Sequence, residues 1–110
     1  MTQTTCIIGA GASGVFAAIQ HKRSFPEHTV ILIEKKSDVL SKVKISGGGR
    51  CNVTHACFDN RDFCANYPRG SKELLGPFHQ FGAQETIDWF QTEGVALKTE
   101  SDGRMFPTSN

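Results

Sequence analysis

Residues 4–14 read TTCIIGAGASG, a short apolar run followed by a glycine-rich turn. The glycines have the spacing G-x-G-x-x-G and are Gly9, Gly11 and Gly14. The apolar run predicts a strand over residues 4–8. The small and apolar residues after the turn predict a helix over residues 12–25, which Pro26 ends. The N-terminus is therefore expected to form a strand, a tight turn and a helix.

A second apolar run, HTVILI, leads into Glu34, about twenty residues past Gly14. It predicts a strand over residues 28–34, and its continuous VILI core predicts burial on both faces, as in parallel sheets. The helix would join the two strands as a right-handed βαβ crossover. Because the turn, the helix start and the acid occur in this order, the segment predicts a dinucleotide-binding unit rather than a turn without a ligand.

The residues of this unit have separate physical roles toward a dinucleotide. Gly9 lets the chain turn off the strand, Gly11 leaves room for a pyrophosphate, and Gly14 lets the helix pack closely on the strand. The helix start offers free N–H groups and a positive dipole end to the phosphates, and Glu34 can accept hydrogen bonds from ribose hydroxyls. A P-loop fits less well because no lysine follows Gly14, and a methyl-donor site because no acid precedes the glycines.

Length and composition restrict the class of protein. The 110 residues allow one domain at most, with 38% hydrophobic and 21% charged residues and a formal net charge of +1. This balance gives no reason to expect a nucleic-acid or membrane partner, and no apolar stretch is long enough for a membrane span. The N-terminus lacks the pattern of a signal peptide, which predicts a cytoplasmic protein.

Residues 37–68 read as polar and irregular, and they contain SGGGRCNVT at 46–54. The triple glycine predicts either a second ligand loop or a flexible surface loop. The cysteines are interpreted as free thiols, with Cys6 in the core. The spacing of Cys51, His55, Cys57 and Cys64 lacks the close pair of ordinary zinc sites, so no metal is predicted.

The C-terminal third predicts helices and a hairpin. Apolar periodicity over residues 71–92, interrupted near Pro77 and Gly82, favours two helices, with Gly94 just past the second. A strand is expected over residues 95–100. A two-residue turn at Asp102-Gly103 would lead to the returning strand at 104–106.

Four segments in order carry a resemblance to a known family: IIGAGASG, VILIEKK, KISGGGRCNVT and EGVALKTESDGRMFP. Together they resemble the bacterial NAD(P)/FAD-dependent oxidoreductases of the BaiN-like or aminoacetone-oxidase-like group. The resemblance covers essentially the whole chain but only the N-terminal part of the family's architecture. It departs at Ser41–Lys44, where the family usually reads G-K-K before the triple glycine.

The resemblance implies FAD on the glycine turn, with NAD(P)H as a possible hydride donor. It implies that Gly9, Gly11, Ala12, Ser13 and Gly14 hold the pyrophosphate, and that Glu34 holds the adenosine ribose with Lys35 beside it. It implies contacts to the flavin-side half of FAD from Gly48, Gly49, Arg50, Cys51 and Asn52. Neither a substrate nor a catalytic residue is implied.

The expected fold class is therefore α/β: a Rossmann-like βαβ unit, a helical excursion and a C-terminal β-hairpin. Residues 1–110 would form the N-terminal part of an FAD/NAD(P)-binding domain, without a second domain. An incomplete sheet leaves an edge at the first strand, which predicts self-association. Two alternatives stay open: an NAD(P)-binding module of a dehydrogenase, and a non-catalytic fragment that does not retain cofactor.

Overall fold

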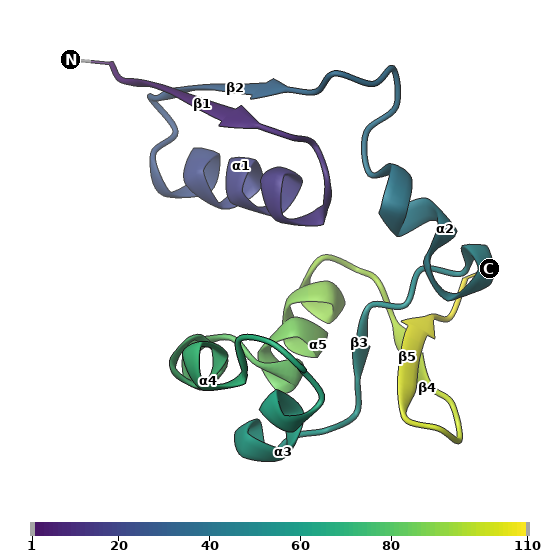
Figure 1. Ribbon diagram of the computed structural model, residues 1–110. Helices are drawn as coiled ribbons and strands as arrows, with labels where there is room; N and C mark the ends of the chain where they lie inside the picture. Colours follow the sequence, from purple (N-terminus) through teal and green to yellow (C-terminus); the bar gives the residue numbers. More distant parts are fainter. Residues whose placement is uncertain (1, 110) are drawn as a thin grey trace. The chain divides into compact units, whose positions relative to one another are not determined.

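The computed structural model describes residues 2–109 and consists of two compact units, residues 1–49 and 50–110 (Figure 1). The first unit contains a parallel βαβ crossover. Strand β1 (Thr4–Ile8) leads into helix α1 (Ala12–Ser24), which returns to strand β2 (Thr29–Ile33). The strands pair in parallel from Thr4 opposite Thr29 to Ile8 opposite Ile33. The α/β fold and the predicted crossover are confirmed, with boundaries within one residue.

The sheet of the first unit is covered on one face. Residues of β1 and β2 alternate strictly between exposed and half-buried, because successive side chains of a strand point to opposite faces. Ile8, Ile31 and Ile33 are 78%, 42% and 46% exposed. The predicted burial of β2 on both faces is therefore wrong, and so is the predicted core position of Cys6, which is exposed. Helix α1 supplies a partner for one face alone.

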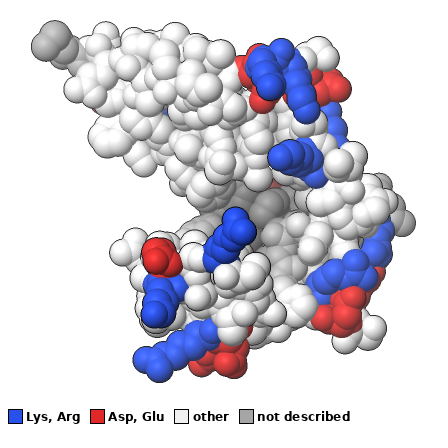
Figure 2. All heavy atoms as spheres, viewed as in Figure 1, with Lys and Arg blue, Asp and Glu red and all other residues white. Residues whose placement is uncertain are grey.

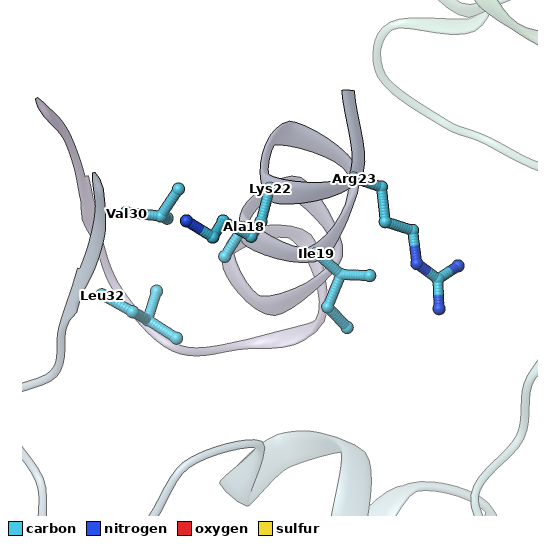
Figure 3. A pocket seen from close by; sticks show the side chains of 6 residues that line it. All are labelled: Ala18, Ile19, Lys22, Arg23, Val30 and Leu32. Atoms are coloured by element: carbon cyan, nitrogen blue, oxygen red, sulfur yellow. The ribbon is translucent and has the colours of Figure 1, made fainter. Parts of the chain in front are cut away.

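Helix α1 packs on the other face, where Ala18 and Ile19 lie opposite Val30 and Leu32 (Figure 3). These side chains line an open apolar groove of about 400 Å³. The ammonium group of Lys22 donates to the carbonyls of Pro26 and His28, at 2.8 and 2.6 Å. Lys22 thus closes the turn that carries the chain from α1 into β2.

Regular elements occur where the sequence predicted an irregular stretch. They are α2 (Ser41–Gly49), β3 (Thr54–His55) and α3 (Asn60–Ala65). Each is short and depends on local contacts that hydrophobic periodicity does not reveal. In α3, the side chain of Asp59 accepts from the backbone N–H of Asp62 at 3.0 Å and caps the helix. In α2, helical geometry stops at Ser46, and Gly47 and Gly48 have φ of 59° and 70°.

The second unit packs helices against a small antiparallel sheet. Helices α4 (Ser71–Gln80) and α5 (Ala83–Thr92) confirm the predicted helix pair, although Pro77 lies inside α4. Strands β4 (Leu97–Thr99) and β5 (Arg104–Pro107) join β3 in the order β3-β5-β4. The buried hydrophobic residues in the described part of the second unit are Cys64, Ala83, Ile87, Met105 and Phe106.

The hairpin between β4 and β5 has a longer loop than predicted. Glu100 and Arg104 form the last backbone pair, through a 2.8 Å hydrogen bond from the Glu100 N–H, so the loop comprises Ser101, Asp102 and Gly103. Gly103 has φ of 88°, the left-handed conformation that closes three-residue loops. Asp102 adds side-chain bonds to the backbone N–H and Nε of Arg104, at 3.0 and 2.6 Å. These bonds favour the longer loop over the expected two-residue turn.

Candidate dinucleotide-binding site

The glycine turn exposes the N-terminus of α1. Gly9 turns with φ of 97°, and its N–H donates to the carbonyl of Ile33 at 2.7 Å, which ties the turn to β2. Gly11 is the N-cap of α1 and offers no side-chain oxygen to the helix. The first turn of α1 carries no acidic residue, whereas its last turn is basic. The positive end of the helix dipole is therefore available to an anion.

The glycines at 11 and 14 serve different purposes. A Cβ atom on Gly14 would lie 1.9 Å from the carbonyl oxygen of Gly9, so only glycine fits at this contact between helix and turn. A Cβ atom on Gly11 would meet nothing within 4 Å. Gly14 is thus required by internal packing, whereas the absence of a side chain at Gly11 leaves space beside the backbone.

Glu34 is held by two backbone groups at the end of β2. Its Oε1 accepts from the N–H of Ala10 at 3.0 Å, and its Oε2 accepts from the N–H of Lys36 at 2.9 Å. The bond from Lys36, followed by the bond from Ala10, holds the pKa of this carboxyl below its ordinary value. Each oxygen keeps a second lone-pair direction, so the oriented carboxylate can still accept hydrogen bonds from a ligand.

One pocket brings the glycine turn and Glu34 together. It has a volume of about 510 Å³ and includes Gly11, Ala12, Ser13, Glu34 and Lys35 from the predicted site. Its other lining residues are Ala10, Lys36, Ser41, Lys42 and Val43. None of these five residues was predicted from the sequence to belong to the site. For Ser41–Val43, the only signal was that the residues before the triple glycine depart from the family pattern.

The second set of predicted site residues lies where the first unit ends and the second begins along the chain. Gly48 and Gly49 end the first unit in left-handed conformation, with φ of 70° and 87°, and Cys51 follows with φ of 62°. In the second unit, the Arg50 guanidinium pairs with Glu100 and lies over the ring of Phe106. The resemblance implies that Arg50 contacts FAD, and the structure gives its guanidinium a carboxylate partner.

Asn52 binds the backbone of the small sheet. With its amide oriented to suit its neighbours, the nitrogen donates to the carbonyls of Thr54 and Met105, at 3.1 and 3.3 Å. The adjacent Val53 N–H also donates to the Met105 carbonyl, at 2.9 Å. These bonds fix the chain that follows Arg50 against β5.

Metal, membrane and charge features add no further site within the described residues. Within residues 2–109, no three His, Cys, Asp or Glu side chains are grouped as a metal site would need. No helix in this range is both long and apolar enough to cross a membrane. On the face shown in Figure 2, most Lys and Arg groups lie next to Asp or Glu groups.

The pKa of Glu34 predicts how acid affects the first unit. Because the folded pKa lies below the ordinary value of 4.5, the ionised carboxylate stabilises folding above that value, and this contribution is lost as the pH falls through the folded pKa. We expect Glu34→Gln to reduce the pH dependence of stability below 4.5. Urea denaturation followed by circular dichroism at several pH values measures this change.

The control for this experiment is Glu73→Gln, which changes an exposed carboxylate in the second unit. It should leave the pH dependence as in the wild type. The pKa of Asp102 is also lowered, chiefly by the backbone N–H of Arg104, so the Glu34→Gln variant keeps one acid-sensitive group. Equal pH profiles for Glu34→Gln and the wild type would contradict the role of the Ala10 and Lys36 bonds.

The fold and the pocket define a class of protein: a parallel βαβ unit with a glycine turn, an open helix N-terminus and an acid at the end of the second strand is a Rossmann-type dinucleotide-binding unit. The family model described as the HI0933-like protein Rossmann domain matches residues 3–110, and the chain belongs to this family. The resemblance seen in the motifs is thereby confirmed.

Curated relatives show the same relationship. The chain is 35% identical over 104 residues to 3-dehydro-bile acid delta(4,6)-reductase of Clostridium scindens, a match covering 94% of this chain and 24% of that protein. It is 31% identical over 100 residues to ribosomal RNA dihydrouridine synthase of Escherichia coli, covering 91% and 24%. The enzyme of that name from Haemophilus influenzae is 29% identical over 100 residues. The chain thus spans 24% of the length of these relatives.

Proposed function

We propose that this chain is the FAD-binding segment of a flavin-dependent oxidoreductase. The proposal rests on one observation: the start of α1 and the oriented carboxylate of Glu34 line the same pocket. A pyrophosphate fits beside Gly11, where no side chain fills the space. A ribose fits at Glu34, whose oxygens keep acceptor capacity. The pocket volume lies within the range of cofactor sites.

FAD is favoured over NAD(P) as the resident cofactor by family membership. The family's distinctive S-G-G-G-R-C-N segment is present at 46–52 and implies a second contact region for the flavin half. A short dehydrogenase would need a Tyr/Lys or His catalytic set. The only tyrosine, Tyr67, has no lysine four residues on and instead lies against Phe63 and Phe78, with ring centroids 6.0 and 5.6 Å away.

In such a protein the cofactor supplies the chemistry, and the chain binds and orients the cofactor. When bound, FAD supplies hydride transfer between a donor such as NAD(P)H and a substrate. The residues of this chain bind and orient the cofactor: the glycine turn and α1 hold the phosphates, and Glu34 fixes the ribose. Lys35, Lys36 and Lys42 line the pocket and place positive charge near the phosphates.

The names of the relatives suggest a reaction class. One is a delta(4,6)-reductase of a 3-dehydro-bile acid, and the other forms dihydrouridine in ribosomal RNA. Both names describe the addition of hydrogen to a carbon–carbon double bond. We propose this reaction class for the protein that contains the present segment. A cytoplasmic location and self-association through the open edge of β1 also stay predictions.

We expect the 110-residue chain to bind FAD weakly, because the pocket at the glycine turn serves the adenosine half, whereas the flavin half has only the short segment Gly48–Asn52. Ordering the flavin half without surrounding walls costs binding free energy. In a titration with FAD monitored by NMR, the backbone amide shifts of Ala10–Gly14 and Lys35–Lys36 should change. The changes should saturate only at high FAD concentration. Glu34→Ala should weaken this binding about tenfold, the effect of losing a charge-assisted hydrogen bond.

Two further ligands make the titration decisive. ADP should perturb the same amides as FAD because it contains the adenosine half, whereas FMN should leave them unchanged. Absence of shifts in the glycine turn at saturating FAD would contradict the proposed function. A tight stoichiometric FAD complex of the isolated chain would instead contradict the expectation that the flavin walls lie elsewhere.

A further inference from the structure

Residues from two of the four segments that carry the family resemblance meet in the second unit. Arg50 belongs to S-G-G-G-R-C-N, whereas Glu100 and Phe106 belong to E-x-x-G-R-x-F-P. The Arg50 Nη1 donates to Glu100 Oε1, and the Arg50 Cζ lies 4.1 Å from the centroid of the Phe106 ring. Phe106 is fully buried, so its ring offers a fixed surface for the guanidinium. Motifs fifty residues apart thus form one cluster.

Glu100 is the centre of this cluster. Its second oxygen, Oε2, lies 3.6 Å from Nη2 of Arg104, so one carboxylate faces two arginines. Arg104 has a carboxylate of its own, because its Nε lies 2.6 Å from Asp102 Oδ2. The Glu100 side chain is 28% exposed, less than those of its charged partners. Glu100 therefore pairs with both Arg50 and Arg104. Asp102 pairs with Arg104.

The chain after Arg50 is held by hydrogen bonds to β5, whereas the chain before it consists of glycines. After Arg50, the Asn52 amide and the Val53 N–H bind the carbonyl of Met105 in β5. Before it lie Gly47–Gly49, three successive glycines with positive φ. Glycine loses more backbone freedom on ordering than any other residue. A fixed anchor at Arg50 shortens the segment that must be ordered.

We propose that Glu100 is a positioning residue for the loop Gly47–Cys51, which the proposed function places against the cofactor. It holds Arg50 on Phe106, and Arg50 in turn restricts the preceding glycines to the conformation in which Gly48 and Gly49 contact the flavin-side half of the cofactor. This inference rests on the proposed function for its ligand. The ordering of the loop by Glu100 is independent of any ligand. Arg50 acts here as an anchor whose charge Glu100 balances, rather than as the main counter-charge of a phosphate.

Hydrogen exchange of the unliganded chain tests the ordering step. We expect Glu100→Gln to speed amide exchange at Gly48, Gly49 and Cys51 by about tenfold, because a charge-assisted bond becomes a neutral one. The matched control is Asp102→Asn, which removes a carboxylate from the same cluster but leaves the contact to Arg50. It should change these rates less than about twofold, since its partner is Arg104.

A double-mutant cycle distinguishes positioning from general destabilisation. Arg50→Lys cannot reproduce the planar stack and pairing of the guanidinium, so it should resemble Glu100→Gln. The double variant should exchange no faster than either single variant, because both remove the same interaction. Additive effects, or equal effects of Glu100→Gln and Asp102→Asn on the loop, would overturn the proposal.

The ligand step has a separate readout. In the FAD titration, the wild type should also show shifts at Gly48–Cys51, and Glu100→Gln should lose these while it retains the shifts at Ala10–Gly14. If the wild type shows no FAD shifts at all, the proposed function fails while the exchange result still decides the role of Glu100. If the wild type and Glu100→Gln show the same FAD shifts at Gly48–Cys51, the positioning role toward the cofactor is wrong.

Discussion

Gly14→Ala is expected to unfold the first unit or destabilise it by at least about 3 kcal/mol, an effect at the upper end for overpacking. The added Cβ would lie 1.9 Å from the carbonyl oxygen of Gly9 and 3.0 Å from its carbonyl carbon. Both are backbone atoms of the turn, so no side-chain rotation can relieve the clash. Far-ultraviolet circular dichroism during urea denaturation measures the loss.

The chain offers an internal reference for this experiment. Its only tryptophan, Trp89, lies in α5 of the second unit. Its fluorescence should therefore follow the second unit while circular dichroism follows both units. The expected outcome is a lost or shifted transition in circular dichroism with a preserved fluorescence transition.

Gly11→Ala is the matched control because the same atom is added to the same turn. Its Cβ would meet nothing within 4 Å, and the backbone φ of −83° suits alanine. The free energy of unfolding should fall by no more than about 1 kcal/mol, because alanine is a poorer N-cap than glycine but its methyl group meets no other atom. ADP binding should nevertheless weaken, since the methyl group enters the proposed pyrophosphate space. Equal losses of stability in both variants would contradict the division of roles between these glycines.

Phe106→Ala is expected to destabilise the second unit by about 3–5 kcal/mol, the usual cost of deleting a buried aromatic side chain. Phe106 is 0% exposed, and the guanidinium groups of Arg50 and Arg104 lie 4.1 and 5.5 Å from its ring centroid. The variant therefore loses core packing and the surface on which Arg50 stacks. Urea denaturation followed by Trp89 fluorescence reports the change in unfolding free energy.

Phe58→Ala is the matched control, because Phe58 is a phenylalanine that lies outside the core. Phe58 is 56% exposed, so its deletion should cost less than about 1 kcal/mol. A cost for Phe106→Ala no larger than that for Phe58→Ala would show that Phe106 is not central to the second unit.

Several elements could be predicted from the sequence because their signals are local. The strand, turn and helix around Gly9–Gly14 follow from apolar runs and glycine spacing, and their boundaries agree with β1 and α1 within one residue. The helix pair α4 and α5 follows from periodicity over ten-residue segments. The short elements α2, β3 and α3 were missed because each is specified by individual hydrogen bonds, such as the Asp59 cap.

The site was predicted where it depends on the motif. Gly11, Ala12, Ser13, Glu34 and Lys35 do line one pocket. Ser41, Lys42 and Val43 were missed because nothing in a linear pattern shows that α2 begins beside the glycine turn. That position depends on the backbone bond from the Leu40 N–H to the Ala10 carbonyl, at 2.7 Å.

The sequence by itself determined that this chain contains a parallel βαβ unit with a glycine turn, because turn geometry and strand pattern are set by neighbouring residues. It also determined the family, through motifs that remain recognisable without a structure. Only the tertiary structure decided which sheet face is covered, because burial depends on where α1 packs and not on how apolar β2 is. Only the tertiary structure brought Arg50, Glu100 and Phe106 together, because a contact across fifty residues requires the antiparallel pairing of β3, β4 and β5.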